Sequence, residues 1–144
     1  MATGMNALGV AIFTKLTGAS ALTALLTGGT AGVFESVAPE GEDPPYVVFN
    51  VQSPSTPAYT FGAASVKYED AIFQVKAITE AHSAASAGTI ADKIDDALNG
   101  ATLTITGYTQ LLCARVQNID YPELAAGGKR FNHRGGLYRV MARP

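Results

Sequence analysis

Residues 71–77, Ala-Ile-Phe-Gln-Val-Lys-Ala, carry the pattern that decides the fold. The apolar residues of this pattern occupy every second position: Ala71, Phe73, Val75 and Ala77. Gln74 and Lys76 stand between them. Successive side chains of a β-strand point to opposite faces, so a period of two places apolar residues on one face and polar residues on the other. The wider segment 66–78 is therefore predicted to be a strand that buries one face.

The segment that follows changes to a helical period. Between residues 79 and 98, small and apolar residues recur at steps of three and four: Ala84, Ala87, Ala91, Ile94 and Leu98. This spacing predicts an amphipathic helix whose alanine-rich face can approach a sheet closely. Gly88 costs about 1 kcal/mol relative to alanine inside a helix, so the helix can also begin as late as Thr89.

Further elements are predicted on both sides of this pair. Aromatic and β-branched residues dominate residues 46–51 (Tyr-Val-Val-Phe-Asn-Val), which predicts a strand. Apolar residues at steps of three and four predict a helix over residues 5–16, and a second short helix carries Leu22, Leu25 and Leu26. Other strands are predicted at 33–37, 103–106, 110–119 and 137–141, and loops at 39–45, 53–64 and 123–136.

The order of these elements predicts an α+β fold with a mostly antiparallel sheet and helices packed on one face. Strands and helices do not alternate regularly, which disfavours a doubly wound parallel sheet. The chain has 144 residues, close to the length of one domain, so residues 1–144 are expected to form a single domain.

Composition excludes several classes of protein. The net charge of −2 gives no general attraction to nucleic acid or acidic lipid. Cys113 is the only cysteine, so no disulfide forms within one chain, and its apolar neighbours predict a buried thiol. No apolar run approaches the roughly 18 residues of a membrane span, and no secretory signal is recognised at the N-terminus.

No pattern for catalysis or for a bound metal or cofactor is found. The sequence contains no phosphate-binding glycine motif, zinc-binding HExxH motif or nucleophile elbow. Neither His82 nor His133 has a second metal ligand three or four residues away. Acidic residues at 92, 95 and 96 are interpreted as a solvated helix face. We therefore expect a protein that is not an enzyme and that has no catalytic residues, no metal and no cofactor.

The distribution of charge points instead to self-assembly or docking. No acidic residue follows Glu123, whereas half of the basic residues lie in the last 16 positions, and four of these are candidate interface residues: Lys129, Arg130, Arg134 and Arg139. The acidic candidates precede the central strands: Glu40, Glu42 and Asp43. Tyr59 and Phe61 are further candidates, in a loop that could order against a neighbour. An acidic patch and a basic patch on one chain suit a head-to-side contact between two copies. Two alternatives stay open: both segments are solvated loops of opposite charge, or the basic segment lines a nucleic-acid groove.

Several segments resemble the tail-completion or tail-terminator proteins of long-tailed bacteriophages. The resemblance begins with the leucines at 16–26 and is clearest at 37–49, where a proline-glycine turn leads into a Pro-Tyr-Val strand. It continues in the strand at 73–75, in the helix at 90–98 and in the closing basic strand at 136–140.

This resemblance implies a structural virion protein without enzymatic activity. Such proteins are expected to form a homo-oligomer, namely a hexameric ring on the head-proximal end of the tail tube. This ring is expected to stop tube growth and to join the tail to the neck or head. The expected partners are the tail tube protein and a neck or head-completion protein. Genomic DNA would pass through the lumen without specific binding, and no membrane would be involved. Synthesis in the host cytoplasm precedes assembly. The alternatives are another neck or tail component (a stopper or a tube subunit) or a small cellular α+β enzyme or binding domain.

Overall fold

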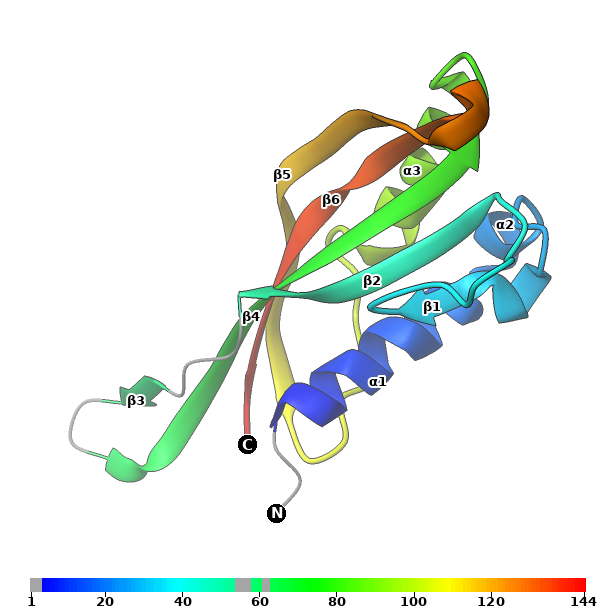
Figure 1. Ribbon diagram of the computed structural model, residues 1–144. Coiled ribbons are helices and arrows are strands. Elements are labelled where there is room, and N and C mark those ends of the chain that lie inside the picture. The colour runs from blue at the N-terminus through cyan, green and yellow to red at the C-terminus, as the bar shows by residue number, and fades with distance from the viewer. Residues whose placement is uncertain (1–3, 54–57, 61–62) are drawn as a thin grey trace.

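A two-layer arrangement of helices on a twisted sheet is seen in the computed structural model, which describes residues 4–53, 58–60 and 63–144 (Figure 1). The helices are α1 (Gly4–Thr17), α2 (Ser20–Thr23) and α3 (Ala85–Leu98), with short 3-10 turns at Gly29–Gly32 and Ala126–Gly128. The strands are β1 (Val33–Glu35), β2 (Tyr46–Ser53), β3 (Ala58–Thr60), β4 (Ala63–Glu80), β5 (Thr109–Leu124) and β6 (Arg130–Arg143). The predicted α+β class is confirmed.

The sheet has the strand order β1-β2-β4-β6-β5, and β3 pairs with β4 outside this path. All pairs are antiparallel except β1 with β2. The long strands β4 and β6 form the centre, with Phe73 opposite Tyr138 and Ala77 opposite Arg134. This order leaves β5 at one edge of the sheet and β1 at the other.

The hydrophobic core lies between the helices and one face of the sheet. The alternation in residues 71–77 is confirmed, because its four apolar members are at most 1% exposed. They pack with apolar side chains from both helices and from β2: Leu8, Ile12, Leu16, Val47, Phe49, Ile90, Ile94 and Leu98. Both predicted long helices therefore cover the same face, as expected.

The helix after β4 begins between the two predicted starts. Thr79 and Glu80 still belong to β4, and α3 starts at Ala85. Gly88 lies inside α3 against β6, where a Cβ atom would come within 2.9 Å of Nη1 of Arg134. The small residue at this point lets α3 approach the arginine side chain.

The predicted loop at 123–136 is wrong over most of its length. β5 continues to Leu124 and β6 begins at Arg130, so the connection is short. Gly135 and Gly136 lie within β6, although glycine pairs usually indicate a turn. A Cβ atom on Gly135 would lie only 2.0 Å from the carbonyl oxygen of Val75, so close approach of two strands explains this glycine.

The strand predicted at 103–106 is also wrong. Ile105 forms only an isolated bridge with Tyr108. The Gln110 side chain satisfies the backbone here, since its amide donates to the carbonyl of Ala101 and its oxygen accepts from the amide of Leu103. Leu103 and Ile105 are each 5% exposed, so their apolar side chains contribute to the core without belonging to a strand of the sheet.

Candidate assembly surfaces

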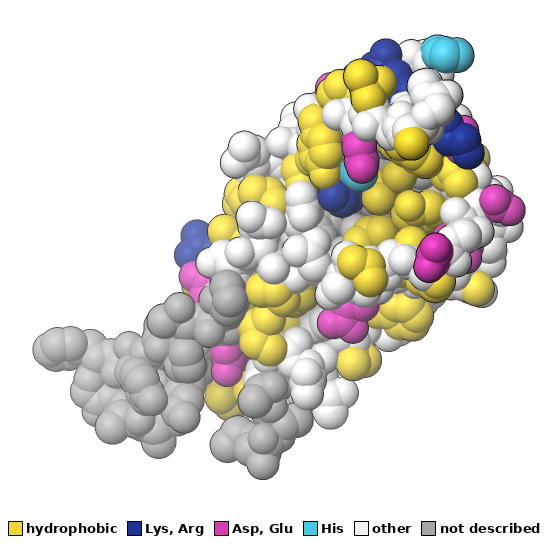
Figure 2. Space-filling view, in the orientation of Figure 1, with side chains coloured by type: hydrophobic (Ala, Val, Ile, Leu, Met, Phe, Trp, Pro, Cys, Tyr) yellow, Lys and Arg dark blue, Asp and Glu magenta, His cyan; other side chains and the backbone are white. Residues whose placement is uncertain are grey.

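The acidic loop and Lys129 lie around one cavity on the helix-free face of the sheet. Glu42 and Asp43 line one side of this cavity of about 490 Å³, and Lys76 and Lys129 line it as well. Its apolar lining includes side chains of β2, β4 and β6: Tyr46, Val48, Ile78 and Phe131. Figure 2 shows hydrophobic side chains gathered over this part of the molecule, with charged side chains among them. Sequence analysis placed Lys129 and the acidic loop in separate docking patches, whereas the fold places Lys129 at the same cavity as Glu42 and Asp43; Arg130, Arg134 and Arg139 do not line it.

The cavity wall also perturbs a titratable group. Burial raises the pKa of Tyr46, and the nearby carboxylates of Glu123 and Glu42 raise it further. The phenol therefore stays neutral at physiological pH.

Two of the candidate arginines form ion pairs within the chain. Arg134 donates to both carboxylate oxygens of Asp120, at 3.0 and 3.1 Å. Arg139 donates to both oxygens of Asp70, at 2.9 and 2.6 Å, and this hydrogen bonding lowers the pKa of Asp70. A neighbouring subunit would have to compete with these bidentate pairs.

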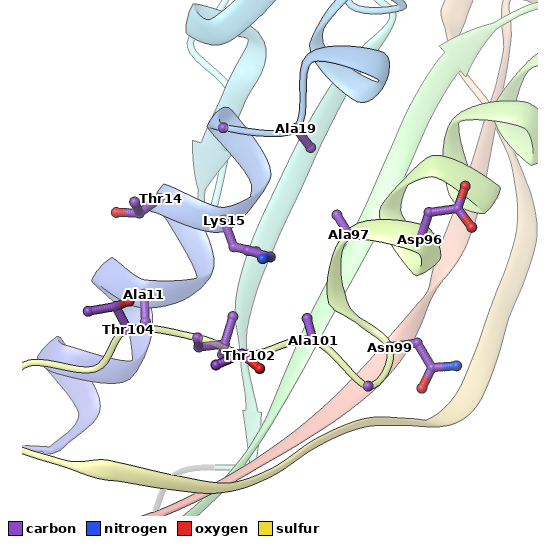
Figure 3. Close-up of a pocket in the computed structure, with 13 residues that line it drawn as sticks. Ala11, Thr14, Lys15, Ala19, Asp96, Ala97, Asn99, Ala101, Thr102 and Thr104 are labelled. Carbon is purple, nitrogen blue, oxygen red and sulfur yellow. The ribbon is translucent and has the colours of Figure 1, made fainter.

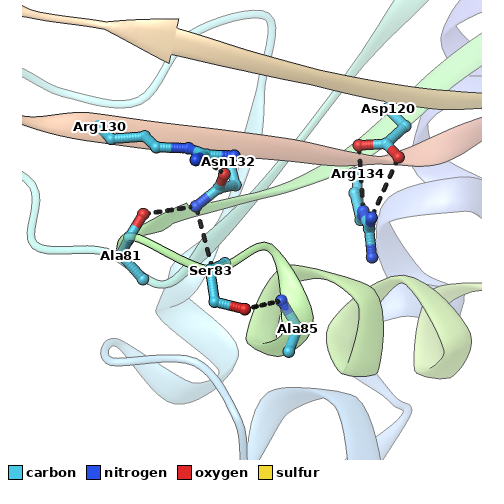
Figure 4. Close-up of polar contacts among 7 residues, drawn as sticks. All are labelled: Ala81, Ser83, Ala85, Asp120, Arg130, Asn132 and Arg134. Carbon is cyan, nitrogen blue, oxygen red and sulfur yellow. Dashed lines mark hydrogen bonds and ion pairs between the residues drawn. The ribbon is translucent and has the colours of Figure 1, made fainter.

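Arg130 has a structural contact as well. It donates to Oδ1 of Asn132, whose amide donates to the carbonyls of Ala81 and Ser83 at 2.8 and 3.2 Å (Figure 4). The Ser83 hydroxyl accepts from the amide of Ala85 at the start of α3. This network holds the turn between β4 and α3 against β6. Lys129 lies 4.0 Å from Glu80, a loose contact between exposed side chains.

The remaining candidates are only partly placed. Glu40 and Asp43 are exposed on the loop before β2. Tyr59 lies on β3, which pairs with β4 with Tyr59 opposite Lys67. Phe61 lies outside the described residues.

His133 belongs to a polar cluster on the helix-free face. It is 5% exposed, its ring stacks on Tyr121, and Nε2 lies 2.7 Å from Glu123. Lys76 donates to the Tyr121 hydroxyl at 2.6 Å. Burial lowers the pKa of His133, and the hydrogen bond with Glu123 only partly offsets this. The histidine is thus a packed, neutral member of the sheet.

Two further groups noted in the sequence are structural in their contacts. Asp95 accepts from the Tyr138 hydroxyl at 3.1 Å and lies 3.4 Å from Arg115, so it is not simply solvated as predicted. Cys113 is buried as predicted, its Sγ lies 3.1 Å from the carbonyl oxygen of Leu98, and burial raises the pKa of its thiol to about 11. A protonated thiol has little nucleophilic character.

Another cavity, of about 630 Å³, lies between the C-terminal ends of α1 and α3 (Figure 3). Small residues dominate its wall, and Lys15 and Asp96 are its charged members. Across residues 4–53, 58–60 and 63–144, no group of three potential metal ligands is present, and no helix is long and apolar enough to cross a membrane.

The surface feature that sequence patterns missed is the exposed apolar character of β5. In the described part of the chain, nine large hydrophobic side chains are exposed, and five of them lie on β5: Leu111, Leu112, Val116, Tyr121 and Leu124. Two others, Val10 and Phe13, lie on the outer side of α1. Sequence showed that these residues are apolar, but the position of β5 at a sheet edge depends on pairing with distant strands.

Comparison with known proteins gives one family and a shared fold. The sequence model of the family described as "Tail completion protein gp17" matches residues 10–143. No curated protein sequence matches significantly. Among solved structures, a chain from the virion of a native gene transfer agent particle has a TM-score of 0.72 at 21% identity, covering 100% of both chains. Another solved chain has a TM-score of 0.60 at 15% identity, covering 94% of both. At such identities, these two structures establish the fold alone.

Proposed function

Because this chain belongs to the tail completion protein gp17 family, we propose that it forms a ring on the head-proximal end of a phage tail tube. Membership of this family makes the chain a structural protein of a phage tail or neck. The narrower role that we propose is that of a terminator. Stacked rings of tube subunits expose the same binding face after each addition, so growth ends only when a different ring covers that face.

The observation that carries this proposal is that seven of the nine exposed large hydrophobic side chains in the described residues lie at two separate places on the subunit. One set lies on the edge strand β5, and Val10 and Phe13 lie on α1. Contiguous exposed apolar surface is typical of protein–protein contacts. A head-to-tail contact joins two different surfaces of identical copies and gives a ring when the rotation closes.

We take six copies for this ring, as the family resemblance implies. Six copies with a net charge of −2 each carry −12, which repels a DNA phosphate backbone weakly and suits passage without specific binding. The proposed partners are the tail tube protein on one face and a neck or head-completion protein on the other. The proposed location is therefore the head-proximal end of the tail.

Charged contacts between copies are proposed for the exposed residues that have weak or no partners inside the chain. Glu40 and Asp43 make no ion pair with any described residue, and the Lys129–Glu80 contact is long at 4.0 Å. The hairpin of β3 and β4 extends away from the body of the subunit (Figure 1). We propose that this hairpin, including Tyr59, also reaches a neighbouring subunit.

The chain is proposed to act without catalysis. Within the described residues, groups with a perturbed pKa contact structural partners, as for Asp70 with Arg139 and Tyr138 with Asp95. Assembly contacts are sufficient for the proposed role.

Deletion of the gene from a phage that carries it tests this function. Electron microscopy of the resulting particles should show tails of abnormal length or tails that are not joined to heads, and expression of the wild-type chain from a plasmid should restore normal particles. A complete lack of tails would instead identify a tube subunit. Tails of normal length with leaking heads would identify a stopper. Particles of normal appearance would refute a role in tail completion.

A further inference from the structure

The outer side of α1 carries exposed apolar side chains that are only partly covered within the subunit, where the ring of Phe13 lies 6.3 Å from that of Phe49. Val10 is 63% exposed and Phe13 is 42% exposed, although the opposite side of the same helix is buried in the core. A helix that is apolar on both sides is normally covered on both sides. The outer side of α1 is therefore expected to have an occupant.

A cavity of about 470 Å³ lies at this surface, between α1 and the edge of the sheet at β1. Its lining includes Gly9, Val10, Phe13 and Glu35. A Cβ atom on Gly9 would meet no heavy atom within 4 Å. Glycine inside a helix reduces stability relative to alanine, and nothing within the subunit requires it at this position. The missing side chain keeps the cavity open.

The opposite edge of the sheet presents side chains that suit this cavity. Two β-bulges in β5 insert Leu111 and Val116 as extra residues, and these side chains are 47% and 51% exposed. Bulges, together with Pro122 in the same strand, interrupt the regular backbone edge that strand addition needs. β5 is therefore suited to contact through side chains and not to extension of the sheet.

Charge complementarity favours contact between these two edges. Arg143 lies opposite Thr109 at the start of β5, is exposed and makes no ion pair within the described residues, whereas Arg115, next to Val116, already lies 3.4 Å from Asp95 of its own chain. Glu35 is exposed at the α1 cavity and makes no ion pair within the described parts of the chain. An apolar surface with basic neighbours thus faces outward at one edge, and an apolar cavity with an acidic member lies at the other.

We propose that the apolar side chains of β5 on one copy, centred on Val116, dock into the α1 cavity of a second copy. The occupant of the cavity is thus the next subunit of the same ring. This inference rests on the proposed function and names the surfaces that join adjacent subunits. Because the two surfaces differ, every subunit uses one of each.

Cross-linking in assembled particles tests the proposal directly. Val10→Cys and Val116→Cys are made separately and together, and purified particles are treated with a short bismaleimide. Cys113 is 3% exposed, so the native thiol should not react. We expect covalent dimers when the single variants are co-expressed, a ladder up to the full ring with the double variant, and only monomers with either single variant alone.

Three results would overturn the inference while leaving ring formation intact. They are complete particles in which the double variant gives no ladder, cross-links between copies of one single variant, and cross-links from Val116→Cys to a different tail protein. Failure of the proposed function appears separately, as normal particles after deletion of the gene.

A second measurement separates assembly from folding. Gly9→Gln fills the cavity with a good helix former, so it should leave the thermal midpoint of the free subunit unchanged or raised, while incorporation into particles falls at least tenfold. Val116→Gln should reduce incorporation to the same degree. The matched control is Thr89→Gln at an exposed position of α3, which should incorporate normally. Normal incorporation of both test variants would contradict the proposal.

Discussion

Substitution of Gly135 by alanine should destabilise the subunit more than its position in a polar, glycine-rich segment suggests. A Cβ atom at this position would lie 2.0 Å from the carbonyl oxygen of Val75 and 2.6 Å from Cα of Lys76. Both contacts are with backbone, which cannot rotate away as a flexible side chain can. Relief of the clash therefore requires β4 and β6 to separate at the centre of the sheet.

The expected loss in the free energy of unfolding is about 3 kcal/mol, the upper part of the range for overpacking a closed site. For a chain of this length, that corresponds to a fall in Tm of roughly 10 °C. Thermal and urea unfolding followed by far-ultraviolet circular dichroism provide the measurement, because the chain has no tryptophan for fluorescence. Both proteins are compared at a concentration at which they sediment as monomers.

Two other glycines make the comparison internally controlled. Gly136→Ala should cost less, since its nearest contacts are at 3.1 and 3.2 Å. Gly9→Ala should stabilise the free subunit by about 0.4–1 kcal/mol, because its Cβ would meet nothing. A Gly135→Ala variant within 1 kcal/mol of the wild type would refute the close approach of β4 and β6.

Three further outcomes are expected. Because burial lowers the pKa of His133, the unfolded chain takes up the proton first as the pH falls. The free energy of unfolding should therefore decrease below about pH 6.5, and His133→Gln should flatten that decrease; an unchanged pH profile in this variant would contradict the prediction. The lowered pKa of Asp70 means that its ion pair stabilises the fold above pH 3.8 and is lost as the pH falls through the folded pKa. Asp70→Asn should thus cost up to about 1 kcal/mol at pH 7 and nothing in strong acid, and an equal cost at both pH values in urea titrations would contradict this. Ile94→Ala should lower the free energy of unfolding by about 2–5 kcal/mol, because Ile94 is 0% exposed; a loss below 1 kcal/mol would place α3 away from the sheet.

The helices and central strands could be predicted because their signals are local. The period of two in residues 71–77 and the steps of three and four around Ile94 each follow from the geometry of one element. Glycine was the main source of error. Gly135 and Gly136 predicted a turn because glycine favours turns, yet here the small residue permits two strands to approach closely. The two reasons for glycine look the same in a sequence.

The role of the candidate interface residues in assembly stays a prediction, but the structure shows where most of them lie. Sequence showed where acidic and basic residues concentrate, and Glu42 and Lys129 do line a surface cavity. It could not show that Arg134 and Arg139 are paired with Asp120 and Asp70, because these pairs depend on strand register across the sheet. The apolar surface of β5 was missed for the same reason.

The α+β class, the buried face of residues 71–77 and the resemblance to phage tail-completion proteins follow from the sequence without the structure. These properties follow from hydrophobic periodicity and local motifs, which are read along the chain. Three features became visible in the folded chain alone: β5 is an edge strand, Val116 lies at a bulge, and Gly9 lines a cavity beside β1. A strand lies at a sheet edge when no further strand pairs with it, and a cavity remains where no other segment packs. Both depend on segments that are distant in the sequence. Local periodicity fixes the direction of a side chain relative to its own backbone, but pairing across the whole sheet decides whether that direction leads into the core or toward another molecule.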